Sequence, residues 1–150
     1  GPALAHKAIA EAEVAADTAC GRRAAFNPTT IPMVVFGDPQ VMAVGLTSEK
    51  AASAGLDPSV FRFPLGASGR ARTMGDSEGT VTVVADAAGT VVGIHAVGSH
   101  VAELAGEAAL AVEMAATVED LAGTIHAHPT IGESIMEAAL GLAGRPVHTR

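Results

Sequence analysis

The chain has 150 residues, enough for one domain of ordinary size, and 49% of them are hydrophobic, as a packed core requires. Sixteen acidic and nine basic residues give a net charge of −7, which argues against nucleic acid or an anionic membrane surface as a partner. No apolar run is long enough to cross a bilayer, and the first residues lack the pattern of a signal peptide. We therefore expect a cytoplasmic protein.

The first predicted element is an alanine-rich helix over residues 4–20, which Gly21 ends. It has few large apolar side chains, so we expect it to pack against something outside its own sequence neighbourhood. The single cysteine of the chain, Cys20, excludes an internal disulfide and is expected to be a small buried helix residue.

Alternating turn signals and β-branched runs predict strands in the middle of the chain. The predicted strands cover residues 33–36, 41–46, 60–65, 80–86 and 90–97, with a short helix over 49–54. Residues 66–73 are interpreted as a solvated or substrate-facing loop. The last two strands form a hairpin and are so apolar that we expect both of their faces to be covered.

Helical signals dominate the remainder of the chain. Apolar residues from Val101 to Ala115 recur at helical spacing, and this helix should lie on the sheet. Two capping-box patterns follow, Thr117–Asp120 and Thr130–Glu133, and the second opens a helix over 134–142. The predicted fold class is therefore α+β, an antiparallel β-sheet with helices packed on it.

The strongest chemical motif is His126-Ala-His128-Pro129-Thr-Ile-Gly-Glu133. Imidazole titrates near neutral pH, and a carboxylate bonded to its far nitrogen would fix the tautomer, which is the arrangement of an acid/base pair. Local sequence alone favours a simpler interpretation, in which Glu133 only caps the helix. His126 and His128 could also be half of a metal site, but no third ligand is near and we expect no metal. The cis or trans state of the bond before Pro129 is open.

Several signatures of cofactor and hydrolase sites are missing. No two of the 17 glycines form a G-x-G pair, so there is no dinucleotide-binding loop, and no G-x-S-x-G elbow occurs. The sequence therefore offers an acid/base pair without a partner for its chemistry.

Four stretches carry a resemblance to a known family: LAHKAIAEAEVAAD, IPMVVFGDPQVMAVGLTSEKA, GTVVGIHAVGSHVAELAGEAALAVE and IHAHPTIGE. In this order and spacing they resemble the C-terminal part of dihydrolipoamide dehydrogenases, which are FAD- and NAD-dependent disulfide oxidoreductases. The resemblance implies that residues 1–30 are the last helix and linker of an FAD-binding domain. Residues 31–150 would be the dimerisation domain.

The resemblance also implies roles for individual residues. His128 would act as base toward the redox dithiol of the partner subunit in a homodimer, and Glu133 would orient it. Ala5 and His6 would approach the flavin of their own subunit, and Pro129 that of the partner. The parent enzyme would use FAD and NAD and serve the lipoyl domains of 2-oxo acid dehydrogenase complexes.

The sequence lacks the FAD fold, the NAD fold and the paired redox cysteines of that family. We therefore expect a fragment that binds no cofactor and is inactive alone. Two alternatives stay open: a free-standing self-associating domain, and a fragment of a related enzyme such as glutathione reductase. The latter family usually has two successive glutamates in its motif, whereas Ser134 follows Glu133 here.

Overall fold

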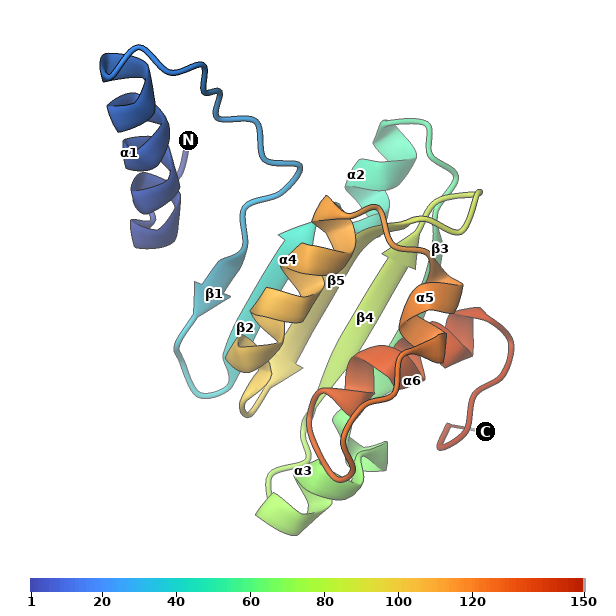
Figure 1. Ribbon diagram of the computed structural model, residues 1–150. Coiled ribbons are helices and arrows are strands. Elements are labelled where there is room, and N and C mark those ends of the chain that lie inside the picture. The colour runs from blue at the N-terminus through green and yellow to red at the C-terminus, as the bar shows by residue number, and fades with distance from the viewer. Residues whose placement is uncertain (150) are drawn as a thin grey trace.

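The computed structural model describes residues 1–149, and its architecture is an α+β fold built on one five-stranded antiparallel sheet (Figure 1). The strands are β1 (Met33–Val35), β2 (Gln40–Gly45), β3 (Ser59–Pro64), β4 (Gly79–Ala85) and β5 (Val91–Gly98). The α-helices are α1 (Ala5–Ala19), α2 (Ser48–Ser53), α3 (Gly69–Met74), α4 (Ala105–Glu113), α5 (Val118–Gly123) and α6 (Glu133–Leu142). Two 3₁₀ turns complete the fold, η1 (Leu65–Ala67) and η2 (Val101–Leu104). The predicted fold class is confirmed.

The strand order is β1-β2-β5-β4-β3, so the predicted hairpin of β4 and β5 lies inside the sheet. The register places Thr82 opposite His95 in that hairpin, while Ala43 of β2 faces His95 on its other side. Gly93 allows a close approach here, because a side chain at that position would collide with the backbone carbonyl of Leu46.

The hydrophobic core lies on one face of the sheet, between the strands and the later helices. Helix α4 packs on β2 and β5, and α6 packs on β3 and β4. Val83, Ile94 and Ile135 are fully buried there. Burial of one such side chain contributes about 1.5–3 kcal/mol. The core therefore fixes the position of α6.

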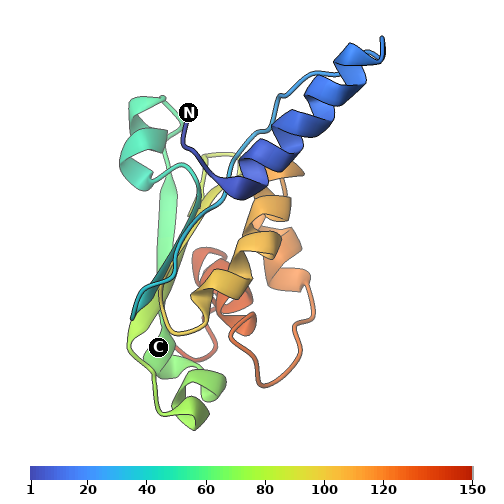
Figure 2. The same ribbon diagram turned by 90° about the vertical axis from the view of Figure 1, so that its left-hand side faces the viewer.

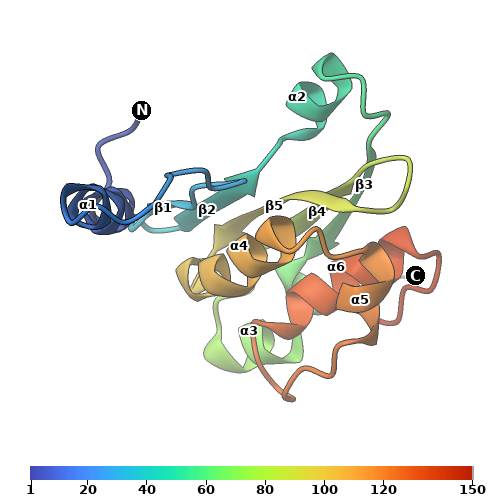
Figure 3. The ribbon, with the colours of Figure 1, turned by 45° about the horizontal axis from the view of Figure 1, so that its top comes forward.

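The opposite face of the sheet is open in this chain, as the edge-on views show (Figures 2 and 3). Val41 and Val97 are 37% and 39% exposed on their strands. The expectation that both faces are covered is thus wrong for the chain by itself. A continuous apolar run predicts that a strand is buried, but it does not say whether the same chain supplies the cover.

Helix α1 stands away from the sheet (Figure 1), and none of its side chains is buried. The Nε2 atom of His6 lies 2.8 Å from the carbonyl oxygen of Pro32, in the linker that leads to β1. Cys20, at the C-terminal cap of α1, is exposed. The prediction of a buried cysteine is wrong, because α1 buries none of its side chains among the described residues. No helix among residues 1–149 has the length and apolar character to cross a membrane.

The segment at residues 66–73 is mostly helical, which corrects its interpretation as a loop. After η1, the side chain of Ser68 accepts a hydrogen bond from the backbone N–H of Ala71, as an N-cap does for α3. Gly75 ends the helix with a φ of 73°. The sequence therefore held both a start and a stop signal.

Candidate functional site

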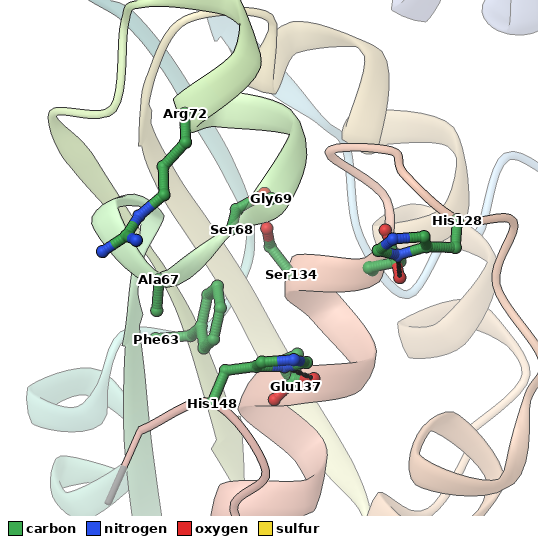
Figure 4. Close-up of a pocket in the computed structure, with 10 residues that line it drawn as sticks. Phe63, Ala67, Ser68, Gly69, Arg72, His128, Ser134, Glu137 and His148 are labelled. Atoms are coloured by element: carbon green, nitrogen blue, oxygen red, sulfur yellow. Dashed lines mark hydrogen bonds and ion pairs between the residues drawn. The ribbon is translucent and has the colours of Figure 1, made fainter.

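The segment between α5 and α6 presents His128 at the surface (Figure 4). Its side chain is 74% exposed, and its Nδ1 atom lies 2.9 Å from Oε1 of Glu133. The peptide bond between His128 and Pro129 is cis. The structure thus brings together the two residues for which the sequence predicted an acid/base pair.

Glu133 is the first residue of α6, and its second carboxylate oxygen holds the turn before the helix. Oε2 accepts a hydrogen bond of 2.8 Å from the backbone N–H of Thr130. The predicted capping box is only half formed, because the Thr130 hydroxyl donates to the carbonyl of Ala127 instead. The two interpretations of Glu133 are therefore compatible, since one oxygen serves the helix start and the other binds the histidine. The box at Thr117–Asp120, in contrast, is complete.

The electrostatics of the site favour an ionised Glu133. Burial raises the pKa of this carboxyl, but hydrogen bonds from the Thr130 N–H and the His128 ring, together with the charges of His128 and His126, outweigh that effect. The net result is a pKa of Glu133 below its ordinary value of 4.5. The carboxylate is consequently an acceptor at neutral pH.

This arrangement sets the chemical capacity of the imidazole. An ionised carboxylate can only accept hydrogen bonds, so Nδ1 of His128 carries the hydrogen that it donates to Glu133. In the neutral ring the lone pair is then on Nε2, where it can take a proton from a donor outside. Once the ring is charged, Glu133 stabilises it. The pair is a competent general acid/base at the surface.

His126 faces inward rather than toward a shared metal site with His128. Its Nδ1 lies 2.9 Å from the carbonyl oxygen of Thr124, and its Nε2 lies 2.7 Å from Oε1 of Glu107 on α4. Both ring nitrogens therefore already have protein partners. In residues 1–149 no three histidine, cysteine, aspartate or glutamate side chains are grouped to hold a metal ion.

A cavity of about 160 Å³ adjoins the dyad between α3 and α6 (Figure 4). Part of the segment 66–73 lines this cavity. Gly69 lies beside the dyad, because a Cβ atom added there would be 3.8 Å from Cε1 of His128. The sequence predicted a solvated or substrate-facing loop here, but nothing in it placed Gly69 beside His128.

A second acid–histidine pair borders the same cavity and was also missed. Nδ1 of His148 lies 2.6 Å from Oε1 of Glu137, whose side chain is 5% exposed. Oε2 of Glu137 and the hydroxyl of Ser134 are buried without a hydrogen-bond partner among the described residues. No local signal predicted this pair, because Glu137 lies three positions after Ser134 on α6, which is the spacing of an ordinary polar helix face.

The three residues expected near a flavin are not brought together. Ala5 and His6 lie at the start of α1, whereas exposed Pro129 lies in the segment before α6, which is remote from α1 in all three ribbon views (Figures 1 to 3). The assignment of Ala5 and His6 to one flavin and of Pro129 to another stays a prediction.

Comparison with known proteins identifies relatives over nearly the entire chain. The chain is 51% identical over 150 residues to the dihydrolipoyl dehydrogenase of Halobacterium salinarum, covering 99% of this chain and 32% of that protein. The structure of LpdA from Mycobacterium tuberculosis superposes with a TM-score of 0.77 at 28% identity, covering 85% of this chain and 28% of that one. The Cu(II) complex of the HOCl-induced flavoprotein disulfide reductase RclA from Escherichia coli has the same fold, with a TM-score of 0.85 at 23% identity over 93% of this chain and 32% of that one.

The chain spans about a third of the length of these relatives, so it corresponds to one part of such a protein. The matching family model is the dimerisation domain of pyridine nucleotide-disulphide oxidoreductases, and it covers residues 31–139. The recognised resemblance is confirmed by this match and by the identity to dihydrolipoyl dehydrogenase. The chain belongs to the pyridine nucleotide-disulphide oxidoreductase family, and its residues 31–139 match the dimerisation domain of that family.

Proposed function

We propose that this chain is the dimerisation domain of a cytoplasmic dihydrolipoyl dehydrogenase, and that His128 and Glu133 act on the redox dithiol of the partner subunit in a homodimer. The observation that carries the proposal is the hydrogen bond between Nδ1 of His128 and Glu133, on a side chain that is 74% exposed. A histidine oriented in this way and open to its surroundings suits a substrate or thiol that approaches from another chain.

The reaction needs a base because a free thiol has a pKa of about 8.5 and is a poor nucleophile at neutral pH. Nε2 of His128 would accept the proton of the attacking thiol of dihydrolipoamide and would later return it to a leaving thiol. Glu133 would keep the ring in the Nδ1–H tautomer and stabilise its charged form. In the complete cycle the dithiol loses two electrons and two protons and becomes a disulfide.

FAD and NAD are the cofactors we assign to the whole protein. When bound, FAD would carry the electron pair from the reduced redox disulfide to NAD. The described residues fit only the edges of such a site, because the family match covers the dimerisation domain and the sequence has no G-x-G loop. Ala5 and His6 would border the flavin of their own subunit, and Pro129 that of the partner.

The homodimer is supported by exposed apolar side chains next to the dyad. Leu110, Met114 and Ile125 are 63%, 71% and 96% exposed, and they line one groove with the segment that leads to His128. Such a group is costly to leave in water and is typical of an interface. The only cysteine of the chain, Cys20, is at the end of α1, so a dithiol must come from elsewhere. Lipoyl domains of 2-oxo acid dehydrogenase complexes are the partners we expect for the whole enzyme.

The proposal is tested by His128→Gln in the full-length reductase that carries this chain. We expect dihydrolipoamide oxidation to fall about 10²–10⁴-fold, the usual contribution of a general base, while bound flavin is retained. His100→Gln, which changes another exposed histidine, is the matched control. Unchanged turnover in the His128 variant would leave the domain with a role in dimerisation alone.

A further inference from the structure

His126 lies two residues before His128 but has the opposite environment. Its side chain is 9% exposed, against 74% for His128. Nδ1 is bonded to the carbonyl of Thr124 within the same segment, and Nε2 is bonded to the carboxylate of Glu107 on α4. One ring therefore joins the segment to itself and to a helix that is packed on the sheet.

The chemistry of these two bonds makes the position selective for histidine. Both partners are acceptors, so both nitrogens can donate together only when the ring carries two hydrogens. A neutral ring beside a carboxylate would keep one bond and lose the other. A glutamine at position 107 could satisfy the neutral ring, because its amide can donate to the nitrogen that lacks a hydrogen.

The ring of His126 also lies beside the start of α6, which carries Glu133. A Cβ atom added to Gly132 would lie 3.6 Å from Cδ2 of His126, so the ring borders the residue directly before Glu133. The charge of His126 adds to the groups that lower the pKa of Glu133. The hydrogen bond from Thr130 to Ala127 closes the same turn. Glu107 is thus linked to the dyad of His128 and Glu133 through a single side chain, that of His126.

We propose that His126 and Glu107 form a positioning pair that anchors the segment 124–132 to α4. This anchor keeps His128 and Glu133 within hydrogen-bonding distance of each other. The geometric claim concerns the chain alone, and only its consequence for turnover rests on the proposed function. A purely structural pair would change stability without changing the His128–Glu133 bond. A positioning pair changes that bond.

The tautomer of the His128 ring shows directly whether the hydrogen bond to Glu133 is present. Donation to Glu133 requires the hydrogen on Nδ1, and the ratio of Nδ1–H to Nε2–H forms is read from the side-chain ¹⁵N shifts of the histidine-labelled full-length protein that carries this chain. The pH is raised until the ¹⁵N shifts of His128 no longer change, so that the ring is neutral and the ratio is measurable. The variant Glu133→Ala calibrates complete loss of the bond.

We expect Glu107→Ala to shift the ratio by at least half of the change that Glu133→Ala causes. Glu107→Gln should preserve the wild-type ratio, because the amide can still bond the ring. The matched control is Glu103→Ala, which removes an exposed carboxylate one helical turn earlier. If Glu107→Ala melts at a lower temperature but keeps the wild-type ratio, the pair is structural and the inference is wrong.

A second measurement keeps the inference testable if Glu107→Ala does not fold. His126→Gln removes the ring but keeps an amide that can reach only one of the two partners, and the ratio for His128 should again move toward that of Glu133→Ala. A wild-type ratio in this variant would overturn the inference. Neither result depends on redox activity, so failure of the positioning pair is distinguishable from failure of the proposed enzymatic role.

Discussion

The energetic link between His128 and Glu133 is measurable with a double-mutant cycle. The variants are His128→Ala, Glu133→Gln and the combination, compared by urea unfolding at one protein concentration and neutral pH. A hydrogen bond to a charged group contributes about 1.5–3 kcal/mol where both partners are shielded from water. The His128 side chain is 74% exposed, so solvent screening reduces the expected coupling to about 0.5–1 kcal/mol.

Glu133→Gln should cost more than His128→Ala. The carboxylate accepts at both oxygens, from Nδ1 of His128 and from the N–H of Thr130. A glutamine has one accepting oxygen and no charge, so its NH₂ group can bond His128 only if the ring changes tautomer, and the charge-assisted bond to the ring is lost. We expect a loss of about 1–2 kcal/mol in the free energy of unfolding, which moves the urea midpoint by roughly 0.5–1 M. The assay follows the far-ultraviolet circular dichroism of the domain.

Two outcomes would refute this reasoning. A coupling energy of zero would mean that the two side chains do not interact in solution. Equal costs for His128→Ala and Glu133→Gln would mean that Glu133 does not hold the start of α6 through Thr130.

The same carboxylate predicts the pH dependence of the cycle. Because the pKa of folded Glu133 lies below its ordinary value of 4.5, the stabilisation is complete above that value and is lost as the pH falls through the lowered pKa. The difference in stability between wild type and Glu133→Gln should therefore be present at about pH 5 and shrink toward about pH 3. A difference that grows on acidification would contradict this sign.

Three further substitutions test the packing around the site. Ile135→Ala creates a cavity under α6 and should lower the free energy of unfolding by about 2–5 kcal/mol in a denaturant titration, whereas Ile9→Ala on exposed α1 should change it by less than about 0.5 kcal/mol. Gly93→Ala forces a Cβ atom against a backbone carbonyl and should cost about 1–3 kcal/mol in the same titration; a neutral result would refute the predicted contact. Leu110→Glu places a charge in the exposed apolar groove and should weaken self-association at least about tenfold by analytical ultracentrifugation, with an unchanged dissociation constant excluding this face from the dimer.

Local signals in the sequence predicted most of the fold. The predicted strand boundaries lie within two residues of the observed ones. Turn signals such as Pro39 and the glycine between β4 and β5 separate the β-branched runs and so mark where each strand ends. The N-cap of α5 was also readable, since Thr117 and Asp120 form a self-contained motif. What failed depended on distant partners. Cys20 is exposed because α1 buries none of its described side chains, and no local sequence pattern shows against what a helix will pack.

The site was predictable where its residues are close in sequence and hidden where they are not. His128 and Glu133 are five positions apart and stand in one motif. Glu107 meets His126 across 19 residues, and His148 meets Glu137 from the chain end across 11, so only the folded structure pairs them.

Complementation between subunits tests the central claim that the dyad acts on the dithiol of its partner. Two full-length variants are co-expressed, one with His128→Gln and one with its redox cysteines replaced by serine, each inactive as a homodimer. If the histidine acts across the interface, every mixed dimer contains one intact site, and random pairing should restore about a quarter of wild-type turnover. Turnover no higher than that of the separate variants would show that His128 serves its own subunit or none, and would contradict the account.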